Sequence, residues 1–244
     1  MSLMKLWPRV HLPAPTPVER AMQDDQARQP RREFLERLGF VAVAASVPSV
    51  RVLDVARRHI AAPGWDMSWV ERVSAARYKA VVDTMKIQDD ELETALDLMD
   101  TFHEVYPGDE MRVVVVLRHY AAAMGLNDAM WDRYAIGEER TITDPATKAP
   151  AKRNVYLRAA PDAKEAWERN GKIEPLVARG VIFLVCNRAA MSLASTLAKK
   201  ANKPVEEVKA DLRANLVPGA TLMPNGIFAL IRAQNAGCAF YRQA

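Results

Sequence analysis

The feature that most constrains the fold is an uninterrupted apolar run at residues 181–185, Val-Ile-Phe-Leu-Val. A run of this length without a polar residue suits a strand that is buried on both faces, as in a parallel sheet covered by helices. Four consecutive valines at 113–116 have the same character. Both runs therefore predict central strands of an α/β fold.

Strand-like and helix-like segments alternate over residues 77–244, which predicts a three-layer α/β/α sandwich with a mainly parallel, about five-stranded sheet. The predicted strands are 78–82, 111–117, 181–185, 220–223 and 238–241. The predicted helices are 89–105, 127–134, 162–178, 188–200, 204–214 and 227–235. The polar stretch 137–160, with prolines at 145 and 150, is predicted to be an insertion or a lid loop. The order of the strands is not readable from the pattern.

The chain divides into a Pro-rich tail with an apolar segment at 1–60, a connector at 61–76 and the α/β domain at 77–244. Residues 1–60 hold 10 Lys/Arg and 6 Asp/Glu, whereas the remaining residues hold 24 of each. Residues 61–244 therefore carry no net charge, and we predict that they do not bind nucleic acid. Trp65 and Trp69 in the connector are four residues apart and are expected to dock it on the domain.

The N-terminal segment resembles a twin-arginine export signal, because Arg31 and Arg32 precede x-Phe-Leu and an uncharged run at 38–50. Those 13 uncharged residues are too few for a membrane-spanning helix, which needs ~20. Glu33 and Glu36 depart from the usual basic or neutral pattern. The resemblance predicts a periplasmic protein. The alternative is a retained amphipathic helix that packs on the domain, on a protein partner or at a membrane.

Polar residues follow several predicted strands, and the carboxyl ends of parallel strands meet at one sheet edge. Cys186 comes where a strand ends and a helix begins, a position that favours the thiolate. The alternative is a small buried core residue. Arg118 and His119 form a cation pair that could stabilise a thiolate or a bound anion, or Arg118 could simply pair with a carboxylate. The residues expected at this edge are Asp83, Thr84, Arg118, His119, Cys186, Asn187, Asn225 and Gly226.

Several common site types have no support in the sequence. Two cysteines form neither a disulfide framework nor a zinc cluster, and His119 with Cys186 is weak support for a metal site. The chain has no Gly-x-Gly-x-x-Gly, no Walker loop and no Gly-x-Ser-x-Gly. We therefore predict no metal and no cofactor.

Residues 77–244 resemble the DsrE/DsrF-like sulfur-relay family. The stretches that carry the resemblance are Met-Arg-Val-Val-Val-Val-Leu-Arg-His at 111–119, Leu-Asn-Asp-Ala-Met-Trp at 126–131, the run 180–187, and the block from Asn-Leu-Val-Pro-Gly at 215–219 through Pro-Asn-Gly at 224–226 to Gly237. The resemblance implies a three-layer α/β/α fold and association as homo- or hetero-oligomers. It also implies a cysteine that carries sulfur as a persulfide.

On this resemblance the leading hypothesis is a sulfur-handling protein that uses Cys186, with Cys238 as a core residue. The expected ligand-binding residues are Arg118, His119, Asn127, Trp131, Asn187 and Asn225. One alternative is a small-ligand or haem-binding protein, with His119 and Cys186 lining a pocket beside Trp131 and Tyr134. The other is an accessory subunit that residues 1–60 dock onto a larger, membrane-bound assembly.

Overall fold

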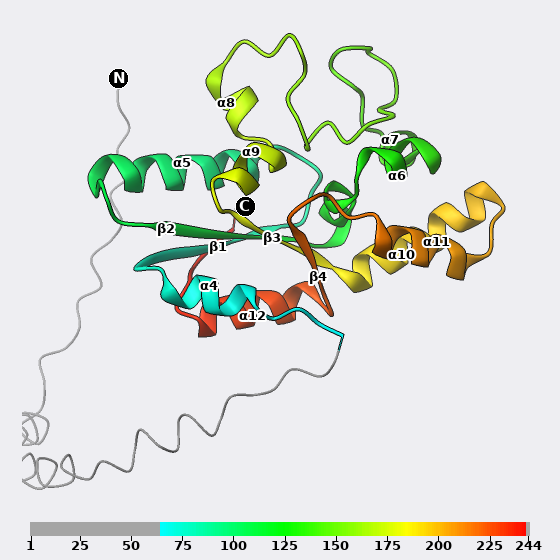
Figure 1. The fold of residues 1–244 in the computed structure, drawn as a ribbon. Helices are drawn as coiled ribbons and strands as arrows, with labels where there is room; N and C mark the ends of the chain where they lie inside the picture. The colour runs from blue at the N-terminus through cyan, green and yellow to red at the C-terminus, as the bar shows by residue number, and fades with distance from the viewer. Residues whose placement is uncertain (1–63, 243–244) are drawn as a thin grey trace, which may run out of the picture. The chain divides into compact units, whose positions relative to one another are not determined.

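The computed structural model describes residues 64–242 (Figure 1). The predicted tail and export signal in residues 1–60 lie outside them. In this part of the chain five strands form one sheet in the order β4-β3-β2-β1-β5, and every neighbouring pair is parallel. The strands are β1 (Tyr78–Thr84), β2 (Met111–Leu117), β3 (Ile182–Cys186), β4 (Ala220–Met223) and β5 (Ala239–Tyr241). The predicted α/β fold with a parallel sheet is confirmed.

The two apolar runs form the centre of this sheet, as their composition predicts. The valines at 113–116 in β2 have no exposed surface, and β3 is buried along its whole length. Alternate residues of each strand belong to two different core layers, which lie on opposite faces of the sheet. Continuous hydrophobicity is therefore needed here, because a polar side chain on either face would enter a core.

Helices cover both faces of the sheet (Figure 1). The larger core lies under α5 (Asp90–Val105), η2 (His119–Gly125), α6 (Asp128–Arg133), α9 (Ile173–Ala178), α10 (Asn187–Ala201) and α11 (Val205–Ala214). The smaller core lies under α4 (Trp69–Ala75) and α12 (Gly226–Asn235). Two further short helices are α7 (Ile136–Glu139) and α8 (Ala166–Asn170). Of the helices in residues 64–242, none combines the length and the apolar character needed to cross a bilayer.

The single helix predicted over 162–178 is wrong. The chain forms α8 and α9 instead, and Gly171 caps the end of α8 by donating its backbone N–H to the Trp167 carbonyl at 2.8 Å. A Cβ atom at position 171 would lie 2.8 Å from that same carbonyl oxygen. Lys172 then adopts an extended backbone, from which α9 begins anew. The pattern of apolar residues did not reveal this turn because it continues through the break.

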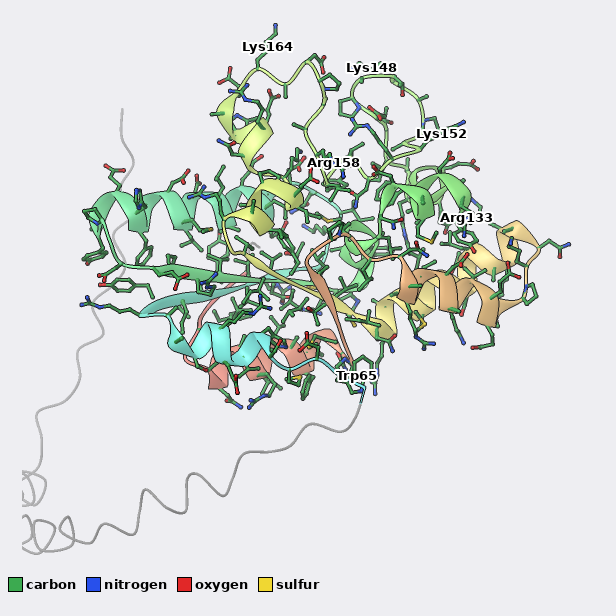
Figure 2. All side chains as sticks on the ribbon, viewed as in Figure 1. Trp65, Arg133, Lys148, Lys152, Arg158 and Lys164 are labelled. Atoms are coloured by element: carbon green, nitrogen blue, oxygen red, sulfur yellow. The ribbon has the colours of Figure 1, made fainter. Side chains whose placement is uncertain are left out.

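The predicted connector at 61–76 contains α4, which is part of the fold. Trp69 and Val73 of this helix are fully buried in the smaller core, so Trp69 docks the segment as expected. Trp65 lies before the first turn of the helix, where Figure 2 labels it. The two tryptophans therefore do not share one helical face.

The connectivity has one change of direction, at β1. The chain steps from β1 to β2, β3 and β4 towards one edge, and then returns through α12 to place β5 on the other side of β1. Helix α5 leaves β1 on one face of the sheet, whereas α12 leads into β5 on the opposite face (Figure 1). The carboxyl ends of β1 and β5 therefore form the topological switch point, where open α/β sheets bind their ligands.

Candidate functional site

The parallel sheet brings several predicted site residues to its carboxyl edge. Cys186 is the last residue of β3, and Arg118 follows the last residue of β2. The backbone N–H of Arg118 donates to the Thr84 carbonyl at 2.9 Å, which extends the β1–β2 ladder by one step. Asn225 caps α12 by accepting a hydrogen bond on its side-chain oxygen. The edge therefore collects a thiol, a guanidinium and a helix N-terminus.

Arg118 is held by a two-pronged ion pair with Asp83. Its Nε and Nη2 atoms lie 2.5 Å from Oδ1 and 2.7 Å from Oδ2 of Asp83. The side chains of Arg118 and Asp83 are 11% and 2% exposed. The pKa of Arg118 is raised, mainly because Asp83 accepts these hydrogen bonds, and the nearby Cys186 acts in the same direction. Arg118 therefore pairs with a carboxylate, as the second of the two interpretations given for it predicts.

Helix α12 fixes the stem of Arg118 from the other side. Gly226, the first residue of the helix, lies so close that a Cβ atom there would be 2.7 Å from the Arg118 Cβ. The guanidinium therefore has little freedom, because its stem is packed against a helix and its head is bound to Asp83.

Cys186 is buried despite its place at the edge, with 6% of its surface exposed. It is the N-cap residue of α10, a helix of 15 residues whose N-terminus carries partial positive charge. Asn187 begins that helix, and its side-chain oxygen accepts a hydrogen bond from Arg213 at 3.4 Å. Cys238, just before β5, is buried in the smaller core, which confirms its predicted core role. Burial raises the pKa of the Cys238 thiol to about 11.

The other predicted binding residues have different surroundings. Asn127 is the N-cap of α6 and accepts the Met130 backbone N–H at 3.2 Å. Trp131 has no exposed surface, and its indole N–H donates to the Ala123 carbonyl at 3.0 Å. Both side chains therefore stabilise α6 and its packing.

His119 is exposed and helps to line a cavity of about 320 Å³ at the carboxyl ends of β1 and β5. It has a left-handed backbone with φ of 51°, and it begins η2. The cavity lies at the switch point, because its lining comes from the end of β1, the segment before α5, the start of η2 and the residue after β5. The lining residues are Asp83, Met85, Lys86, Gln88, Glu91, His119, Tyr120 and Arg242.

Glu91 is the least expected residue of this cavity. It is 3% exposed, and its Oε2 atom has no hydrogen-bond partner among residues 64–242. Burial raises the pKa of this carboxyl, against the hydrogen bonds from its own backbone N–H and from Gln88. Sequence reasoning missed Glu91 because an acid in the first turn of an amphipathic helix is commonly a solvated partner of the helix dipole.

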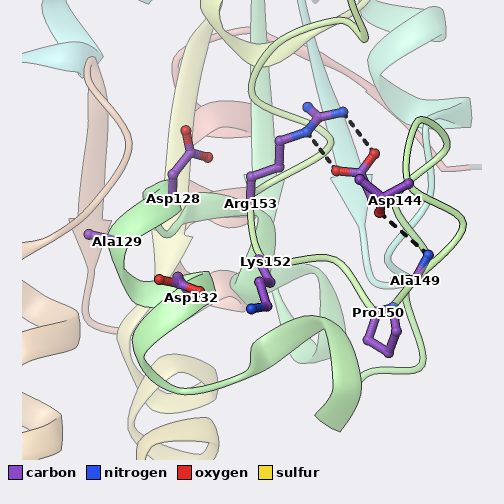
Figure 3. Close-up of a pocket in the computed structure, with 9 residues that line it drawn as sticks. Asp128, Ala129, Asp132, Asp144, Ala149, Pro150, Lys152 and Arg153 are labelled. Atoms are coloured by element: carbon purple, nitrogen blue, oxygen red, sulfur yellow. Dashed lines mark hydrogen bonds and ion pairs between the residues drawn. The ribbon is translucent and has the colours of Figure 1, made fainter.

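A larger hollow of about 630 Å³ lies between α6 and the loop after α7 (Figure 3). Asp144 and Arg153 in its wall bind each other, with Nε to Oδ2 at 2.7 Å. Lys152 and Lys148 lie on the same loop (Figure 2). This hollow is open to solvent, and Asp144 and Arg153 in its wall neutralise each other. Its larger volume therefore does not make it a better candidate for a ligand site than the cavity at β1 and β5. No group of three or more potential metal-binding side chains occurs within residues 64–242.

The insertion predicted at 137–160 is firmly attached to the domain. Asn154 is almost fully buried, and its Nδ2 donates to the Met124 carbonyl at 2.7 Å and to the Leu126 carbonyl at 2.8 Å. Gly137 packs so tightly that a Cβ atom would lie 2.2 Å from the Ala151 carbonyl oxygen. The segment 137–160 is therefore packed against the rest of the domain.

No known protein family matches the chain, and no curated protein matches it. Among solved structures, the chain is similar to MTH1491, a protein of unknown function from Methanobacterium thermoautotrophicum. The two share 14% sequence identity with a TM-score of 0.31, over 68% of this chain and 99% of MTH1491. No family is assigned by these comparisons.

Proposed function

We propose that the protein handles sulfur and that Cys186 takes up sulfane sulfur as a persulfide. The observation that carries the proposal is the position of this thiol. It is the N-cap residue of α10 at the carboxyl edge of the sheet, near the guanidinium that Asp83 holds in place. A cysteine attacks as its thiolate, and the N-terminus of a helix carries partial positive charge that stabilises an anion.

The proposed step exchanges one S–S bond for another. The thiolate of Cys186 attacks the outer sulfur of a donor R–S–SH, the donor S–S bond breaks, and its electron pair leaves on R–S⁻. The products are Cys186–S–SH and R–S⁻, so no external oxidant or reductant is needed. The small exposed area of Cys186 restricts the donor to a small molecule.

The two cysteines provide a matched test. We expect the full-length protein to gain the mass of one sulfur atom after brief exposure to inorganic polysulfide, as measured by intact-protein mass spectrometry. Cys238→Ser should keep this gain, because that thiol is buried and has a raised pKa. Cys186→Ser should lose it. Uptake in Cys186→Ser equal to that of the unsubstituted protein would contradict the proposal.

We also propose that copies of the chain associate through the outer face of α12. Ile227, Phe228 and Ile231 are exposed large apolar residues on this helix, whereas its other side packs on the sheet. Burying such a group between copies removes apolar surface from water at about 25 cal/mol per Å².

Light scattering on Ile231→Lys tests the association. The variant should shift towards the monomer while its unfolding free energy changes by no more than about 0.5 kcal/mol, as is usual for surface substitutions. An unchanged assembly, or a monomeric unsubstituted protein at micromolar concentration, would exclude this face.

A further inference from the structure

We propose that the cavity at the carboxyl ends of β1 and β5 is a second binding site, which takes a small planar organic anion and in which Glu91 donates a hydrogen bond to an oxygen of that ligand. This site is separate from Cys186, which does not line the cavity. It therefore goes beyond the sulfur chemistry and does not depend on it.

The topology supports a ligand at this place. The cavity joins residues from the end of β1, the start of α5, the start of η2 and the position after β5, which are distant in the sequence and meet at the switch point. Crevices outside the carboxyl ends of strands at such points are where open α/β folds bind small molecules. A volume of about 320 Å³ suits a small organic molecule, since ligand pockets start at ~300 Å³.

Glu91 indicates which chemical group of a ligand would meet it. This residue lines the cavity, and its Oε2 atom is buried without a partner in the described region, so a turn of the carboxyl group towards a ligand would supply the missing hydrogen bond. Gln88 already binds this carboxyl, and burial favours its protonated form. A protonated carboxyl is a donor, so it matches a carbonyl, carboxylate or phosphoryl oxygen.

The charges around the rim favour an anion. Lys86 and Arg242 line the cavity with exposed side chains, and no ion pair among residues 64–242 uses either. Asp83 also lines the cavity, but Arg118 neutralises it through two hydrogen bonds. A ligand carboxylate near the rim would therefore meet two available cations.

Apolar groups in the lining favour an organic ligand over an inorganic ion. Met85 and the exposed ring of Tyr120 line the cavity together with the polar groups. The Arg140 guanidinium lies 5.0 Å from the centre of the Tyr120 ring, which helps to hold the ring in place. A planar ligand could lie against this ring while its charged end faces Lys86 and Arg242.

The probe for this site is benzoate, compared with acetate and inorganic phosphate, in calorimetric titrations of the full-length protein. We expect benzoate to bind more tightly than either comparison anion. Lys86→Gln with Arg242→Gln should weaken benzoate binding about tenfold or more, because charge-assisted hydrogen bonds are lost. Tight binding of phosphate without binding of benzoate, or no binding of any of the three, would overturn the proposal.

The pH dependence distinguishes the role of Glu91 from simple attraction between charges. The charged or titratable groups that face Glu91 or the cavity are Asp83, Lys86, Asp90, His119, Tyr120 and Arg242. The series is measured on His119→Asn, so that no imidazole lines the cavity, and asparagine tolerates the left-handed backbone at this position. In this background benzoate affinity should fall several-fold as the pH is raised above the ordinary range of a Glu carboxyl, because Glu91 loses the proton that it donates.

Two substitutions on α5 complete the experiment. Adding Glu91→Gln should keep benzoate binding and remove the pH dependence, because the amide donates a hydrogen bond at every pH. Adding Glu93→Gln instead, an acid on the same helix that does not line the cavity, should leave the pH dependence unchanged. An unchanged pH dependence with Glu91→Gln would overturn the role of Glu91. These results would be unaffected if Cys186 took up no sulfur from polysulfide.

Discussion

The carboxyl ends of β3 and β1 belong to the same sheet edge, yet they offer different things to a ligand. The end of β3 carries the thiol of Cys186, and packing leaves it little exposed surface. The end of β1 carries a cavity lined by Glu91, which has a buried carboxyl oxygen without a partner in the described residues. The thiol and the available space are therefore at different strands. The residue type at position 186 determines where the thiol is, whereas the connectivity of the strands determines where the cavity is, because the cavity lies where the chain changes direction.

The ion pair of Asp83 with Arg118 connects these two ends. Asp83 lines the cavity, while Arg118 lies close enough to Cys186 for the thiol to contribute to its raised pKa, and it packs on Gly226. Three substitutions test how far the two ends are independent. They remove the ion pair, crowd the Arg118 stem and neutralise Glu91, and the effect of each on stability is measured.

The largest effect is expected from Asp83→Ala. This substitution leaves the Arg118 charge largely buried without its partner, which should lower the free energy of unfolding by about 3–5 kcal/mol in a denaturant titration. The matched control is Asp109→Ala, which removes an exposed partner of Arg77 and should change the same quantity by about 1 kcal/mol or less. Similar losses for the two variants would mean that the buried pair contributes no more than a surface one.

A smaller effect is expected from Gly226→Ala. The added methyl group would press on the Arg118 stem, and overpacking of this kind costs about 1–3 kcal/mol. Helix propensity opposes this by up to ~1 kcal/mol, so a net loss of stability indicates that the contact dominates. The comparison is Gln234→Ala on the exposed side of α12, where thermal unfolding should scarcely change. A stabilised Gly226→Ala would show that Arg118 moves aside freely.

The smallest effect on stability is expected from Glu91→Gln. Because the folded-state pKa of Glu91 is raised, folding retains a proton that the unfolded chain releases, and stability falls as the pH rises through the window above the ordinary value of 4.5. The amide variant should therefore unfold at a higher temperature than the unsubstituted protein at pH 7. This difference should disappear below the ordinary pKa, where both states are protonated. A lower unfolding temperature at pH 7 would contradict the raised pKa of this buried carboxyl.

The sequence predicted the sheet better than the cavity, for physical reasons. The runs at 113–116 and 181–185 identify buried parallel strands because both faces of such strands must be apolar. The ion pair of Asp83 and Arg118 joins residues 35 positions apart, so it depends on a strand register that the pattern does not contain. The cavity depends in addition on the position of β5, and the sequence pattern does not specify strand order.

The position of β5 also has a consequence for biosynthesis. Among the strands in the described residues, β1 is synthesised first, yet its second neighbour is completed only when residues 239–241 have been made. Until then one edge of β1 is an unpaired template for another chain, which is the usual origin of strand-mediated aggregation. A nascent chain would therefore benefit from a chaperone that shields residues 78–84, and a ribosome that stalls before residue 239 would release a product that is prone to aggregate.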